Sequence, residues 1–116
     1  MLYTKCMTHL TAQEKKALQL FKQRLLAQLP NQIEELKLFG SKARGESNKF
    51  SDMDVWVVVI HDSLPVRNTL YKVASQIMLE TDIDISLHVF SAAHIRSMQE
   101  TGSPLLMNVK REGMSL

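Results

Sequence analysis

The sequence has little of what several classes of protein require. Its single cysteine, Cys6, cannot form a disulfide within the chain, which excludes a small disulfide-stabilised scaffold. No apolar run approaches the roughly 20 residues that cross a bilayer, and the N-terminus lacks the apolar core of a signal peptide. The formal net charge of +2 gives no reason to expect direct nucleic-acid binding. We therefore expect a cytoplasmic protein that does not contact the membrane.

What the sequence does contain is typical of an ordinary globular protein. Of its 116 residues, 45% are hydrophobic and 22% are charged. A chain of this length can bury a core without help from disulfides or structural metals. We expect residues 1–10 to form an N-terminal tail and residues 11–116 to form a single domain. Acidic residues outnumber basic ones only after residue 50, which would suit a cation site in that part of the chain.

Helical periodicity follows a capping signal near the N-terminus. Thr11 and Glu14 have the spacing of a capping box, and the helix should end before Pro30. Later helices are expected from about residue 65 to 80, 92 to 98 and 104 to 112. The apolar face of the first helix is predicted to contain Leu18, Phe21, Leu25, Leu26 and Leu29.

Three short apolar segments read as strands, at about residues 36–39, 53–60 and 83–89. The run from Val55 to Ile60 is β-branched and nearly continuous, which indicates a strand buried on both faces. In the third segment, alternate residues are apolar, so Asp84, Ser86 and His88 share the opposite face. The order of helices and strands predicts an α/β (α+β) fold, with a small mixed sheet flanked by helices.

Two carboxylates, Asp52 and Asp54, stand at the entrance to the second strand. Side chains alternate along a strand, so both point to one side, with Cα atoms about 6.6 Å apart. Adjacent carboxylates repel each other unless a hard divalent cation lies between them. Gly40 and Ser41 precede this pair; glycine lets a phosphate approach the backbone, and serine can donate hydrogen bonds to it. These features together predict a metal-dependent enzyme that acts on nucleotides.

With Gly40-Ser41 followed, after ten residues, by Asp52-x-Asp54, the sequence resembles the DNA polymerase β-like nucleotidyltransferase superfamily. A lone Gly-Ser or a lone Asp-x-Asp pair would be weak evidence. Their spacing and their strand context make the combination specific. The resemblance implies the fold of that superfamily and a reaction that transfers a nucleoside monophosphate from a nucleoside triphosphate.

Further matches point to the small prokaryotic members of the superfamily. Ala43-Arg44-Gly45, Ser51, Asp84 and the closing segment 108–113 resemble the minimal nucleotidyltransferases, the MntA-like antitoxin group. Many of these proteins form the antitoxin half of a pair with a HEPN-type toxin. The resemblance covers nearly all of the chain after the first helix.

The resemblance also implies roles for individual residues. Asp52 and Asp54 would hold two Mg²⁺ ions, with Mn²⁺ as an alternative, and Asp84 would complete the metal site and accept the proton of the attacking hydroxyl. Asp82 has the same strand parity as Asp84 and is the alternative third carboxylate. Asp84 is preferred because the strand begins directly after it, as the family pattern requires. The expected nucleotide-binding residues, with ATP as substrate, are Gly40, Ser41, Arg44 and Ser51.

Other polar residues near these motifs have simpler interpretations. Ser51 either orients Asp52 or caps the loop, and these alternatives are evenly balanced. Lys42 is expected to be a solvated loop charge, and residues 46–50 a flexible loop. His88 is the only histidine with a route to the site, but packing at the sheet edge is the favoured interpretation. Trp56 is expected in the core and not as a platform for a base.

Three functions compete at this level. The first is transfer of AMP from ATP to a tyrosine hydroxyl of a HEPN-type toxin partner, which silences the toxin. The second is a binding-only antitoxin with a vestigial nucleotide site; the intact carboxylates argue against it. The third is a nucleotidyltransferase acting on a small aminoglycoside-like molecule, for which 116 residues leave little chain to build an acceptor cleft. Homo- or hetero-oligomers are compatible with all three.

Overall fold

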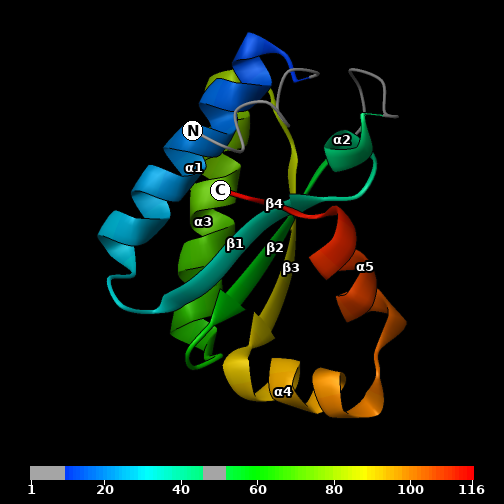
Figure 1. The fold of residues 1–116 in the computed structure, drawn as a ribbon. Coiled ribbons are helices and arrows are strands. Elements are labelled where there is room, and N and C mark those ends of the chain that lie inside the picture. Colours follow the sequence, from blue (N-terminus) through cyan, green and yellow to red (C-terminus); the bar gives the residue numbers. More distant parts are fainter. Residues whose placement is uncertain (1–9, 46–51) are drawn as a thin grey trace.

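A four-stranded mixed sheet in the order β3-β2-β1-β4 forms the centre of the molecule (Figure 1). The computed structural model describes residues 10–45 and 52–116. Strand β2 is antiparallel to β1 and parallel to β3, while the short β4 is antiparallel to β1. The elements in chain order are α1 (Ala12–Gln28), β1 (Ile33–Phe39), α2 (Ser41–Arg44), β2 (Met53–Val59), α3 (Leu64–Thr81), β3 (Ile85–Ser91), α4 (Ala92–Thr101), α5 (Pro104–Glu112) and β4 (Met114–Ser115). The predicted α/β class is confirmed.

Helix ends follow the signals in the sequence. Thr11 and Glu14 form the predicted capping box at the start of α1, and each later long helix begins after a serine whose hydroxyl accepts a backbone N–H. One expectation about the face of α1 is wrong. Leu26 is 46% exposed, because it lies beside the apolar stripe that Leu18, Phe21, Leu25 and Leu29 bury. Leu10, the last residue of the expected tail, is buried in the core.

The two faces of the sheet are covered differently. Helices α1 and α3 lie side by side over one face, where they enclose the larger apolar core, and α4 and α5 lie on the other side (Figure 1). A smaller apolar cluster on that second side is formed by Trp56, Val58, Leu106 and Val109. Both faces of β2 are therefore buried from Val55 to Val59, as its continuous apolar run predicted.

Strand β4 was not expected from the sequence. Its two residues pair with Lys37 and Leu38 of β1, and the Leu116 N–H donates to the Leu36 carbonyl. Two residues are too few to show any period, so only the contact with β1 defines this strand. No helix in the described part of the chain is long and apolar enough to cross a membrane.

Candidate active site

The Gly-Ser loop and the second carboxylate are in direct contact. Gly40 follows β1 with a φ of +79°, a conformation that other residues rarely adopt. A Cβ atom at this position would lie 2.6 Å from Oδ2 of Asp54. The absence of a side chain at Gly40 therefore lets the carboxylate of Asp54 pack against the loop backbone, and it brings the two predicted motifs together.

The first and third carboxylates lie at the same end of neighbouring parallel strands. The Met53 N–H donates to the Asp84 carbonyl at 3.0 Å, which fixes the entrance of β2 beside the entrance of β3. Asp52 and Asp84 directly precede these strands, and both are exposed. Asp82, the alternative third carboxylate, instead adopts a left-handed conformation (φ 60°) at the C-terminal cap of α3. The two aspartates therefore lie in different backbone settings, a helix cap for Asp82 and a strand entrance for Asp84.

The donor set suits a hard divalent cation, although the side chains are not gathered into a cage. No group of three or more His, Cys, Asp or Glu residues among residues 10–45 and 52–116 is arranged to hold a metal ion. Mg²⁺ is commonly bound by one or two carboxylates together with substrate phosphates, so a complete protein cage is not required. Carboxylates at the entrances of two neighbouring strands, beside the loop at Gly40, fit that mode of binding.

His88 packs on the outer strand of the sheet, as the sequence analysis favoured. Its Nε2 also lies 3.1 Å from Oδ1 of Asp54, so it contacts the candidate site as well. The ring also meets Phe39 edge-on, with centroids 4.9 Å apart. The shared strand parity of His88 and Asp84 was the available signal. Trp56 is fully buried, as predicted.

The prediction of a solvated Lys42 is wrong. Its side chain is buried, and Nζ lies 2.5 Å from Oε2 of Glu14, while the other oxygen of Glu14 accepts the Thr11 N–H. Burial alone would raise the pKa of the Glu14 carboxyl, but the hydrogen bonds with Lys42 and Thr11 outweigh it and lower that pKa. Through its contact with Lys42, Glu14 of the capping box thereby holds α2, the helix that follows Gly40, against the first turn of α1.

The remaining predicted nucleotide-binding residues lie around α2. Ser41 and Arg44 are the first and last residues of this one-turn helix, so the backbone keeps them close to Gly40. Ser51 and the expected flexible loop at residues 46–50 fall outside the described residues. The roles of these residues in binding the nucleotide stay predictions.

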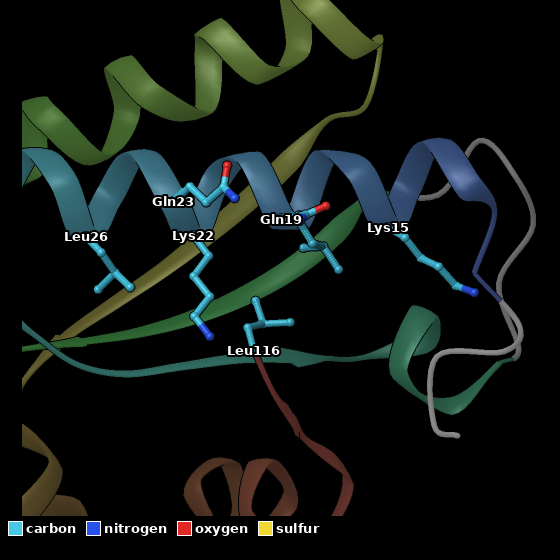
Figure 2. Close-up of a pocket in the computed structure, with 7 residues that line it drawn as sticks. Lys15, Gln19, Lys22, Gln23, Leu26 and Leu116 are labelled. Carbon is cyan, nitrogen blue, oxygen red and sulfur yellow. The ribbon is translucent and has the colours of Figure 1, made fainter. Parts of the chain in front are cut away.

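A separate hollow of about 410 Å³ lies between α1 and the C-terminal residue Leu116 (Figure 2). Among the residues that the structure describes, no candidate site residue lines it. Its lining residues are Lys15, Leu18, Gln19, Lys22, Gln23, Leu26 and Leu116. Its described lining has no acidic side chain and no strand entrance, so this hollow does not offer the chemistry of the candidate site.

Comparison with known proteins identifies the family of the chain. The sequence pattern of the family described as "Polymerase beta, Nucleotidyltransferase" matches residues 22–112, which is more than half of the chain. No curated protein matches the chain.

Solved structures share the fold. One, described as a toxin-antitoxin with AMP-PNP, has a TM-score of 0.55 and 20% identity, and the match covers 82% of this chain and 68% of that one. Another, a mutant of the toxin-antitoxin MntA-HpeT, has a TM-score of 0.54 and 22% identity, with 89% and 70% covered. At these identities the likeness establishes the fold, while the family match spans both motifs of the site. The chain belongs to the polymerase β nucleotidyltransferase family.

Proposed function

We propose that this chain transfers AMP from ATP to a hydroxyl group of a second protein. The observation that carries the proposal is the contact between Gly40 and the carboxylate of Asp54. It joins the loop expected to bind the triphosphate to a carboxylate expected to bind metal. A nucleotidyltransferase needs these two functions at one place, because the cation must act on the phosphate that reacts.

In the proposed reaction, the acceptor oxygen forms a bond to the α-phosphorus of ATP, and the bond to pyrophosphate breaks. Asp84 takes the proton of the acceptor hydroxyl. Asp52, Asp54 and Asp84 would hold two Mg²⁺ ions, or Mn²⁺ in their place. The bound cations supply positive charge that offsets the charge developing on the phosphate oxygens. The triphosphate is bound by Gly40, Ser41, Arg44 and Ser51.

We infer that the acceptor is a tyrosine of a HEPN-type toxin, which would make this chain the antitoxin of a pair. The resemblance to minimal nucleotidyltransferases supports this identification of the partner. So do the two similar structures, since both are described as toxin-antitoxin structures and one of them contains AMP-PNP. Transfer of AMP to a toxin side chain would add bulk and negative charge at the modified position, which is a direct way to block a site.

The proposal is tested by incubating the purified chain with α-labelled ATP, Mg²⁺ and the protein encoded beside it. The wild type should label that protein, and the double variant Asp52→Asn/Asp54→Asn should not. Without the metal ligands, the transition state of the double variant loses several kcal/mol of stabilisation, which corresponds to roughly a 1,000-fold slower transfer.

Asp84→Asn and Asp82→Asn form a matched pair of variants two residues apart. Only Asp84→Asn should abolish transfer, because Asp82 caps α3 and asparagine tolerates its left-handed backbone.

Other outcomes would favour the other hypotheses. If wild type and double variant bind the neighbouring protein equally tightly and neither labels it, the chain is a binding-only antitoxin. If labelled AMP appears only on a small hydroxyl compound such as an aminoglycoside, the acceptor is not a protein. If Asp82→Asn abolishes transfer and Asp84→Asn does not, the third carboxylate has been wrongly assigned.

A further inference from the structure

Asp54 is held from two sides, unlike the other two carboxylates of the candidate site. Its Oδ2 faces the backbone of Gly40, and its Oδ1 lies 3.1 Å from Nε2 of His88. Asp52 and Asp84 are exposed and make no side-chain hydrogen bond or ion pair within the described part of the chain. Among the contacts of the described residues, Asp54 is therefore the one carboxylate of the proposed metal site that a side chain already orients.

His88 is itself anchored by aromatic packing. Its ring meets Phe39 at an interplanar angle of 75°, and Phe39 meets the buried ring of Trp56 at 84° with centroids 5.9 Å apart. In the sheet, His88 is the register partner of Trp56 across the parallel pair β2–β3. Edge-to-face contacts of this kind favour one orientation of each ring. The imidazole is thus fixed by the core cluster on the same face of the sheet as Asp54.

The hydrogen bond between His88 and Asp54 has a defined donor and acceptor. An ionised carboxylate can only accept, so the imidazole donates to Asp54 through Nε2. Each carboxylate oxygen has two acceptor sites, and this leaves room on Asp54 for both an imidazole N–H and a cation. In metalloproteins, ligating carboxylates are themselves held by hydrogen bonds, and loss of such a contact typically costs 10-fold to 100-fold in metal affinity or activity.

We propose that His88 is a positioning residue, which holds Asp54 in the orientation that binds the divalent cation. This rests on the proposed function only in requiring that Asp54 bind a metal, and not on the identity of the acceptor. His88 need not touch the nucleotide or the acceptor. Because His88 already holds Asp54 before the cation binds, the side chain of Asp54 loses less conformational entropy on binding.

The test measures Mn²⁺ binding directly, in the presence of a non-hydrolysable ATP analogue, by the electron paramagnetic resonance signal of free Mn²⁺. His88→Ala should raise the Kd for Mn²⁺ about 10-fold or more. His88→Gln should restore most of the affinity, because its amide nitrogen can donate from nearly the same position as Nε2. The unfolding temperature should change little, since the His88 side chain is 37% exposed.

His94→Ala is the matched control. This histidine is exposed and contacts Phe90, with ring centroids 5.3 Å apart, and Phe90 in turn packs on Trp56. No contact joins His94 to Asp52, Asp54 or Asp84 among the described residues. Its variant should bind Mn²⁺ within about twofold of the wild type. Loss of the aromatic contact alone would therefore not reproduce the effect of His88→Ala.

Three results would overturn the proposal. An unchanged Kd in His88→Ala shows that Asp54 does not depend on His88, and an equally weakened His88→Gln shows that hydrogen-bond donation is not its role. Absence of Mn²⁺ binding by the wild type removes the metal that Asp54 was inferred to hold. If the wild type binds Mn²⁺ in a His88-dependent way but transfers no AMP to the neighbouring protein, the positioning role stands and the proposed function fails.

Discussion

The two faces of the sheet differ in what they bury, although alternate residues of the same strands form them. On the face covered by α1 and α3, β2 presents Met53, Val55, Val57 and Val59, all buried. On the other face, the same strand begins with Asp54 and continues with Trp56 and Val58. A shift of one residue in register would turn Asp54 into the apolar core. Packing on the face under α1 and α3, here called the closed face, therefore fixes the position of Asp54 on the other face. Stability and chemistry are thus divided between the faces, and each can be tested separately.

The largest expected effect comes from the closed face. Phe21 of α1 is fully buried, and Phe21→Ala should reduce the free energy of unfolding by about 3–5 kcal/mol. Leu106→Ala, on the other face, should cost less, about 2 kcal/mol, because partly exposed side chains around its small cluster can relax into the space. Urea denaturation of both variants measures the difference. Equal losses would contradict the view that the core under α1 and α3 dominates stability.

The next effect concerns the link from the closed face to the Gly-Ser loop. Glu14→Gln removes the charge that pairs with the buried Lys42, and breaking such a pair costs roughly 3 kcal/mol. Because the folded state lowers the pKa of Glu14, its stabilisation is present above the pKa of a free glutamate, about 4.3, and is lost as pH falls through the lower, folded-state pKa. The variant should therefore lose less stability than the wild type on acidification. Melting curves from pH 7 to pH 3 test this, and parallel losses in both proteins would refute it.

The smallest effect on stability, with a large effect on activity, is expected at Gly40. Gly40→Ala places a Cβ against Asp54, and Gly102→Ala is its control because Gly102 has a similar positive φ of 69° but no atom within 4 Å of the added carbon. Both variants should lose about 1–2 kcal/mol through backbone strain. Only Gly40→Ala should slow transfer, roughly 10-fold to 100-fold, because it displaces the carboxylate. Melting temperatures and transfer rates of the pair separate the two causes, and equal transfer rates would argue against a close contact in the working enzyme.

Local signals in the sequence were sufficient for much of the fold. The capping box at Thr11 and the apolar run of β2 each depend on residues a few positions apart, and these elements form where they were predicted. Strand β4 escaped prediction because it consists of two residues and exists only through its pairing with β1. Leu26 lies beside the buried stripe of α1, and periodicity does not reveal how wide a stripe of the helix the rest of the fold covers.

The site was predictable in its motifs but not in its supporting contacts. The spacing makes Gly40 recognisable after β1, and Asp52, Asp54 and Asp84 recognisable at the entrances of β2 and β3. The environments of Lys42 and His88 depend on partners far away in the chain: Glu14 comes from α1, and Asp54 is 34 residues before His88. No local pattern contains such a pairing, so both residues were assigned the simpler environment of a loop or a sheet edge.

The topology of the sheet also determines the order in which the site can assemble during folding. Gly40 directly follows β1 and Asp54 lies on the next strand, β2, which is antiparallel to β1, so a short chain closure brings them together. His88 reaches Asp54 only after the segment containing α3 has crossed the sheet and β3 has docked beside β2 in parallel. Closing the longer segment costs more chain entropy, and β3 is the outer strand of the sheet. If β3 detaches first on unfolding, Asp54 keeps its contact with Gly40 but loses the imidazole that orients it.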